Sequence, residues 1–246
     1  AGAKLKLAGT GVKEVTVEHI SEILAKLANI PVGTLVESEK EKLKKLKDNL
    51  KATVFGQEEA VEKVVKAVML SRANLVAKDK PIASFLMAGP TGVGKTELAR
   101  QVSKSLDIPL IRFDMSEYMD KHSVARLTGA PPGYVGHEEG GQLVNAVRKN
   151  PHCILLLDEI EKAHPDIFNI FLQVMDYGKL TDTHGKKADF KNVIIMLTSN
   201  AGATQISKSS MGFGTADENN DHAKEARDEV IKKSFKPEFI NRIDAI

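Results

Sequence analysis

Cysteine, long apolar runs and an excess of one charge are all scarce in this sequence. The 246 residues contain one cysteine, Cys153, which excludes a disulfide scaffold. The seven histidines have no cysteine or histidine partner at zinc-ligand spacing, so a zinc site is not expected. No apolar run approaches the roughly 18 residues that a membrane helix needs, and no signal peptide is visible. We therefore expect a cytoplasmic protein that does not act in a membrane.

The charge of the chain is nearly balanced. A net charge of +2 with 28% charged residues leaves no polybasic footprint, so the composition does not favour nucleic acid as a partner. The length is sufficient for one or two domains with a substantial core. Cys153 lies in an apolar segment, and we interpret it as a small buried hydrophobe.

The most informative segment is a glycine-rich loop at residues 89–96, with the sequence Gly-Pro-Thr-Gly-Val-Gly-Lys-Thr. It matches the Gly-x-x-x-x-Gly-Lys-Ser/Thr phosphate loop, in which glycines let the main chain approach a polyphosphate and a following helix directs N–H groups at the phosphates. Lys95 is expected to reach the β- and γ-phosphates, and the Thr96 hydroxyl to hold Mg²⁺. The predicted nucleotide-binding residues of this segment are Pro90, Thr91, Gly92, Val93, Gly94, Lys95, Thr96 and Glu97.

Two acidic residues follow a short apolar segment later in the chain. Residues 153–157 are predicted to form a fully buried parallel strand, and Asp158 and Glu159 come directly after it. Asp158 fits the carboxylate that a nucleotide-bound Mg²⁺ needs, and Glu159 is placed to orient and polarise the attacking water. Such a pair could simply solvate a strand end, but its occurrence with a phosphate loop favours the catalytic interpretation.

A third apolar segment, residues 192–199, precedes Asn200. The carboxyl ends of parallel strands gather at one ligand crevice, so Asn200 is a candidate to hydrogen-bond the attacking water or the γ-phosphate. Asparagine after a strand is more often a turn former, and the residues alone favour the turn.

Strands and helices alternate along the chain, which predicts an α/β fold with a parallel sheet covered on both faces. We expect residues 1–53 to contain the end of a preceding module and a helical linker, and residues 54–246 to form the globular unit. The strands are expected at about 82–88, 109–113, 153–157 and 193–198.

In combination the motifs resemble the AAA+ protein unfoldases of the Clp/Hsp100 family, in particular the second ATPase module of the ClpA type. The resemblance implies a P-loop AAA+ large subdomain, with a parallel five-stranded sheet and helices on both faces, preceded by a short helical linker. It also implies that the C-terminal small lid subdomain is absent, so the isolated chain would hydrolyse ATP poorly and be mainly monomeric. The segments that carry it are 54–57, 89–96, 113–118, 129–136, 157–165, 198–200 and 235–242.

The resemblance assigns further roles, beginning with the nucleotide. Val54 and Phe55 look like residues of the adenine pocket, and ATP or ADP with Mg²⁺ would be the cofactors. Asn200 matches the sensor-1 position, which raises it above the turn interpretation. Arg242 matches an arginine finger that acts on the nucleotide of the neighbouring subunit in a homohexamer.

Two loops would contact proteins. Tyr134 and Val135 match the central-pore residues that grip unfolded or tagged substrate polypeptides, which adaptor proteins can deliver; without the resemblance, Tyr134 would be an ordinary exposed turn tyrosine. The apolar tripeptide Met211-Gly212-Phe213 lies in a polar stretch with no core to join, so it is interpreted as a plug for a ClpP-type peptidase. The alternative for this tripeptide is a plain glycine turn.

Three other functions remain open. Within the family, a ClpB-type disaggregase would work without a protease. A nucleotide-gated assembly module would bind ATP and hydrolyse little, although the intact Lys95, Asp158, Glu159 and Arg242 argue against it. A nucleic-acid motor is possible on fold alone, but the balanced charge speaks against it.

Overall fold

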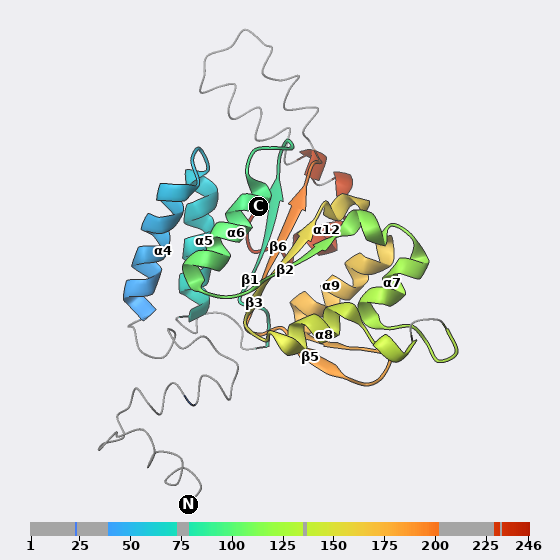
Figure 1. The fold of residues 1–246 in the computed structure, drawn as a ribbon. Coiled ribbons are helices and arrows are strands. Elements are labelled where there is room, and N and C mark those ends of the chain that lie inside the picture. Colours follow the sequence, from blue (N-terminus) through green and yellow to red (C-terminus); the bar gives the residue numbers. More distant parts are fainter. Residues whose placement is uncertain (1–22, 24–38, 73–78, 135–136, 202–228, 232) are drawn as a thin grey trace, which may run out of the picture.

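The computed structural model shows a central sheet enclosed by helices (Figure 1). It describes residues 23, 39–72, 79–134, 137–201, 229–231 and 233–246, with the backbone alone for residues 39–44.

Four parallel strands form the central sheet, in the order β1-β6-β3-β2. Every residue of β3 and β6 is buried, as expected for inner strands of a parallel sheet covered on both faces. The register sets Leu155 of β3 opposite Ile195 of β6 and Ile111 of β2. The strands are β1 (Ala83–Ala88), β2 (Leu110–Asp114), β3 (Cys153–Asp158) and β6 (Val193–Ser199).

Alternate residues of the strands face two different cores, because successive side chains of a strand point to opposite faces. Ile154 and Leu156 of β3 join the core formed with α4, α5 and α6, while Leu155 and Leu157 join the core formed with α7, α8 and α9. Figure 1 shows these two groups of helices on opposite sides of the sheet. The helices are α4 (Glu39–Thr53), α5 (Glu58–Arg72), α6 (Lys95–Leu106), α7 (Lys121–Thr128), α8 (Gln142–Lys149), α9 (Pro165–Tyr177) and α12 (Pro237–Ile240).

Short elements connect these layers. Three of them are 3-10 helices, and β4 pairs with β5 as an antiparallel hairpin apart from the main sheet. Their bounds are η1 (Met115–Tyr118), η2 (His137–Glu139), η3 (Ile160–Lys162), β4 (Lys179–Thr181) and β5 (Lys187–Asp189).

The expectation of five strands is wrong for the described part of the chain, in which the main sheet has four. At the edge of β1, Ala245 forms an isolated parallel bridge with Phe85. The amide of Leu86 donates to the Ala245 carbonyl at 3.0 Å, and the amide of Asp244 donates to the Ser84 carbonyl at 2.9 Å. A strand needs consecutive paired residues, so the fifth position of the sheet holds one bridge and no ladder.

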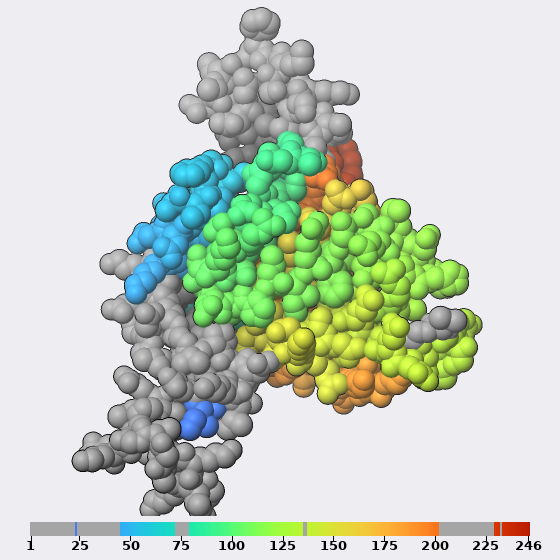
Figure 2. Space-filling view, in the orientation of Figure 1, coloured from blue at the N-terminus to red at the C-terminus, as the bar shows by residue number. Residues whose placement is uncertain are grey.

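The domain boundary expected at residue 53 falls inside the folded body. Leu46 and Leu50, spaced to lie on one face of α4, are fully buried and belong to the same core as α5 and α6. Lys47 and Lys51 pair with Glu62 of α5 at 3.1 and 3.5 Å. Figure 2 shows the blue surface of α4 lying directly against the green surface of α6. The amphipathic helix expected as a linker therefore packs as part of the same folded body.

Cys153, the first residue of β3, is buried in the core, as the sequence predicts. Burial raises the pKa of this thiol to about 12, so it stays protonated near neutral pH. Across the described ranges, no helix combines the length and the apolar character required to cross a bilayer.

Candidate functional site

The glycine-rich loop lies between the end of β1 and the first turn of α6. Gly92 and Gly94 have φ values of +86° and +98°, a left-handed region that residues with a side chain rarely adopt. A Cβ at either position would meet nothing within 4 Å, so backbone conformation and not crowding requires glycine here. The space beside the loop is open, and the N-terminus of α6 supplies the partial positive charge and free N–H groups that suit an anion.

The Lys95 ammonium is folded back onto the loop. Its Nζ donates to the carbonyl oxygens of Gly89 at 2.6 Å and Pro90 at 2.8 Å, and to Oδ1 of Asn200 at 2.8 Å. Burial lowers the pKa of Lys95, while nearby carboxylates, chiefly that of Glu161, oppose the shift. The cation thus has neutral oxygen partners that phosphate oxygens could replace.

Asp158 ends β3 and faces the loop. Its two carboxylate oxygens lie 3.4 and 3.5 Å from the Thr96 hydroxyl. Thr198 donates a short hydrogen bond to Oδ1, and Arg112 of β2 holds Oδ2 with Nε at 2.9 Å and Nη2 at 2.7 Å. A hydroxyl and a carboxylate are the hard oxygen donors that Mg²⁺ prefers, so Thr96 and Asp158 fit a metal on the phosphates.

Glu159 has a left-handed backbone, with φ +56° and ψ +51°, which is uncommon for a residue with a side chain and often marks a functional site. Its amide donates to Oγ1 of Thr198 at 2.9 Å, which anchors this conformation. Its Oε2 pairs with Lys162 at 2.5 Å, and its Oε1 accepts from the amide side chain of Asn200 at 3.2 Å. Both carboxylate oxygens therefore have partners in this arrangement.

Asn200 connects the phosphate loop to the acidic pair. Its Oδ1 accepts from Lys95 and its Nδ2 donates to Glu159, so one side chain bridges residues from two other segments of the chain. Its backbone amide donates to Oε1 of Glu161 at 2.8 Å, while the buried Oε2 of Glu161 has no hydrogen-bond partner among the described residues.

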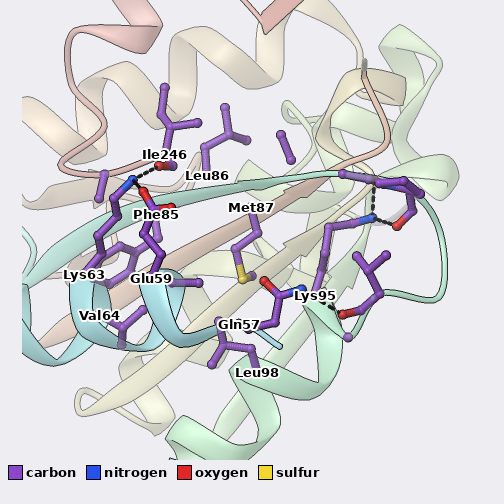
Figure 3. A pocket seen from close by; sticks show the side chains of 17 residues that line it. Gln57, Glu59, Lys63, Val64, Phe85, Leu86, Met87, Lys95, Leu98 and Ile246 are labelled. Carbon is purple, nitrogen blue, oxygen red and sulfur yellow. Dashed lines mark hydrogen bonds and ion pairs between the residues drawn. The ribbon is translucent and has the colours of Figure 1, made fainter. Parts of the chain in front are cut away.

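A cavity of about 270 Å³ opens beside the phosphate loop. Figure 3 shows that it extends from Lys63 at one end to Lys95 at the other, with Met87 and Leu98 in its wall. Gln57 also lines it and donates to the Val93 carbonyl at 3.2 Å. A largely apolar slot with polar ends next to an anion-binding loop suits a flat aromatic base carrying phosphates.

The structure does not place Val54 or Phe55, the expected adenine contacts, in the wall of this cavity. Val54 is buried in the core, whereas the Phe55 side chain is 81% exposed. The chain turns at Gly56, which has φ +69°, and Gln57, directly before α5, and Val64 of α5 line the cavity instead.

The remaining residues of the loop contribute in different ways. Thr91 is exposed, while Pro90 and Val93 line the cavity. Glu97 pairs along α6 with Arg100 and Gln101, each at 2.6 Å, so its carboxylate is engaged away from the loop.

Comparison of the sequence with known protein families identifies the family to which the chain belongs. Residues 80–246 match the family model described as AAA domain (Cdc48 subfamily). The chain belongs to the AAA family. This confirms the ATPase class, and the α/β fold with its parallel sheet agrees with it.

The chain, over nearly its whole length, is similar to proteins of three Clp types. It is 49% identical over 234 residues to a ClpA homolog protein of Fuscovulum blasticum, covering 95% of this chain and 29% of that protein. It is 52% identical over 237 residues to the chaperone protein ClpB of Clostridium perfringens (strain 13 / Type A), covering 95% and 27%. It is 50% identical over 240 residues to the negative regulator of genetic competence ClpC/MecB of Bacillus subtilis (strain 168), covering 95% and 30%. The chain thus spans less than a third of the length of these relatives, and the resemblance to Clp/Hsp100 proteins is confirmed.

Two other expected functional residues, Arg242 and Tyr134, do not line this cavity. Nε of Arg242 donates to both carboxylate oxygens of Asp176 at 2.8 Å, and its Nη1 donates to the Glu238 carbonyl at 2.8 Å. Tyr134 is 68% exposed in the loop before η2. Val135 and the tripeptide Met211-Gly212-Phe213 lie outside the described residues.

Sequence reasoning missed three side chains of this AAA site: Arg112, Glu161 and Lys162. Arg112 directly precedes the recognised segment 113–118, and the other two lie within the segment 157–165. A polar residue on a strand neighbouring the acidic pair, or two or three residues after it, was the available signal. Arg112 contacts Asp158, and Glu161 contacts the backbone of Asn200, so these two contacts join separate segments and could not be read from spacing. Lys162 pairs with Glu159, three residues earlier.

Proposed function

We propose that this AAA domain hydrolyses ATP to drive the unfolding and translocation of polypeptides, as one subunit of a hexameric ring. The observation that carries the proposal is the hydrogen-bonded chain from Lys95 through Asn200 to Glu159. It joins the anion-binding loop to the acidic strand end at one edge of the sheet, where parallel α/β folds bind their ligands.

The residues of this site would have different roles in hydrolysis. Thr96 and Asp158 would hold Mg²⁺, which neutralises charge on the phosphates. Lys95 would exchange Gly89, Pro90 and Asn200 for phosphate oxygens. That exchange would free Oδ1 of Asn200 to accept a hydrogen bond from a water molecule and so to orient it.

Glu159 would then act on the oriented water. Its carboxylate must leave the ion pair with Lys162, because a carboxylate bound by an ammonium is a poor proton acceptor. Arg112 keeps Asp158 in place meanwhile through its two-nitrogen contact.

Assembly into a ring is supported by the surroundings of Arg242. Its side chain is 34% exposed at the end of α9 and binds Asp176 and Glu238 instead of the phosphate loop of its own chain. A partly exposed guanidinium in this position would exchange these partners for a nucleotide in a neighbouring subunit, where it would stabilise transition-state charge.

The exposed Tyr134 would supply grip on the polypeptide. We expect Tyr134→Ala in the assembled protein to keep the rate of ATP hydrolysis within about twofold of normal and to stop the unfolding of a stable substrate. The reason is that the phenol side chain of Tyr134 contacts the substrate and takes no part in the chemistry. Hydrolysis and the loss of signal from a folded fluorescent substrate are the measurements.

Tyr177 provides a matched control, since it is also 68% exposed but lies at the end of α9. Tyr177→Ala should leave both activities unchanged. Normal unfolding by the Tyr134 variant would return this residue to an ordinary exposed turn.

We further propose that the unfolded chain passes to a ClpP-type peptidase, and the support is the apolar tripeptide Met211-Gly212-Phe213 in a polar stretch. A ClpB-type disaggregase is the second candidate, because the identity to a ClpB relative, 52%, is no lower than the 49% to a ClpA relative.

Phe213→Ala distinguishes these two functions. Burial of one phenylalanine stabilises a contact by roughly 1.5–3 kcal/mol, so one loop binds weakly and several loops on a ring bind together. The variant should lose binding to a ClpP-type peptidase in a pull-down while its ATPase rate is unchanged, and Ser209→Ala in the same stretch should bind normally. Undiminished binding by Phe213→Ala would favour the disaggregase.

A further inference from the structure

Ala130 and His137, on the two sides of the loop that carries Tyr134, contact Thr183 and His184 at the tip of the β4–β5 hairpin. The rings of His137 and His184 are stacked, with centroids 4.3 Å apart and planes 17° from parallel. The carbonyl oxygen of Ala130, on the other side of the loop, accepts from the Thr183 hydroxyl at 3.1 Å. The same carbonyl lies 2.8 Å from Nδ1 of His137, which must carry the proton because a carbonyl only accepts. Both sides of the loop thus meet the hairpin.

The backbone of Tyr134 is hydrogen-bonded to His137, which stacks on the hairpin tip. The backbone amide of His137 donates to the Tyr134 carbonyl at 3.2 Å, and the amide of Tyr134 donates to the Pro131 carbonyl at 3.2 Å. A displacement of His137 would therefore move the backbone of Tyr134.

Hydrogen bonds and close packing hold the hairpin tip in place. Oδ1 of the buried Asp182 accepts from the amides of His184 at 2.9 Å and Lys186 at 2.8 Å. The amide of Thr183 donates to the Thr128 carbonyl at 3.2 Å. A Cβ on Gly129 would lie 2.3 Å from the Thr183 hydroxyl, so the tip packs directly on the residue before Ala130. The tip can transmit a displacement because it has little freedom of its own.

The hairpin is also the covalent connection between two elements of the nucleotide site. Helix α9 follows η3, which begins directly after Glu159, and it leads into β4. Strand β5 leads into β6, which ends one residue before Asn200. Figure 1 shows the hairpin beside α8, with α9 above it. A displacement of Glu159 can therefore reach the hairpin through α9, and a displacement of Asn200 can reach it through the buried strand β6.

We infer that Thr183 and His184 are positioning residues that link nucleotide occupancy to the placement of Tyr134. The inference rests on the proposed function, in which nucleotide draws Lys95 away from Asn200. That exchange alters the bonds of Asn200, which follows β6, and of Glu159, which precedes η3 and α9, and the hairpin carries the change to the loop. Coupling between two sites of this kind requires an element that both contact, which the hairpin supplies.

The sequence contains no tryptophan, so Tyr134→Trp introduces a single fluorescent reporter into the chain. We expect Mg-ADP to change the emission and acrylamide quenching of this reporter. Adding Thr183→Val and His184→Ala, which remove the hydroxyl and the ring stack, should abolish most of that change. Calorimetry should show an affinity for Mg-ADP within about fivefold of the reference, the lower end of common coupling energies.

A conservative pair serves as the control. Thr183→Ser and His184→Phe keep the hydroxyl and the stacked ring, so the fluorescence response should return, and thermal melting checks that each variant is folded. A full response without the hydroxyl and ring would overturn the link, as would a silent reporter in a reference chain that binds Mg-ADP. Absence of Mg-ADP binding by the reference chain would instead overturn the proposed function, and the link with it.

Discussion

Replacing Glu159 with glutamine is expected to leave ATP binding intact and to slow turnover by about 10²–10⁴-fold, the usual contribution of a positioned base. The amide has the shape of the carboxylate, so the contact with Asn200 can persist. It has no negative charge to accept a proton from water or to pair with Lys162. Steady-state hydrolysis by the assembled protein, measured beside nucleotide affinity, tests this directly.

Glu229 offers a matched control, because it also pairs with a lysine a few residues later in the chain, Lys233, at 2.8 Å. Glu229→Gln should turn over ATP at the normal rate. If turnover by Glu159→Gln stayed within about threefold of normal, another residue would have to act on the water. A wild-type protein that binds ATP and hardly hydrolyses it would instead favour the nucleotide-gated assembly module.

Removing the Lys95 ammonium is expected to weaken binding of Mg-nucleotide by about tenfold to a hundredfold or more. A hydrogen bond to a charged group is worth roughly 1.5–3 kcal/mol, and Lys95 is the mobile cation of the phosphate loop. Its present partners are neutral oxygens and could be exchanged for phosphate oxygens at little cost. Isothermal titration of Lys95→Ala with Mg-ADP gives the affinity.

Lys104 lies in the last turn of the same helix and provides the comparison. Lys104→Ala removes an equal charge from α6 at the end remote from the loop, so its affinity for Mg-ADP should be unchanged. Equal affinities for Lys95→Ala and the unaltered chain would contradict the assignment of residues 89–96 as the phosphate-binding loop.

Local patterns in the sequence were sufficient to predict the positions of the four main strands and of the phosphate loop. The apolar segments expected at 82–88, 109–113, 153–157 and 193–198 appear as strands within one residue of those bounds. The inner strands β3 and β6 are runs of apolar residues buried on both faces, and burial of this kind leaves a signal in consecutive residues. The same holds for the loop, whose glycines at positive φ and whose lysine and threonine are neighbours in the chain.

The family was also accessible from sequence, because its motifs are short and continuous. The match of residues 80–246 to the AAA domain confirms it. Which Clp type the chain resembles most was not decided in this way, since relatives of three types have similar identities, between 49% and 52%.

What the amino-acid sequence determined by itself was therefore the set of strands, the phosphate loop and the family. The tertiary structure decided how those parts meet: α4 packs into the core through Leu46 and Leu50, and α5 lines the cavity in place of Phe55. It also decided that Glu159 pairs with Lys162 and that His184 stacks on His137. Strands and loops are specified by neighbouring residues, whereas most of these contacts join distant segments and depend on how helices pack on the finished sheet.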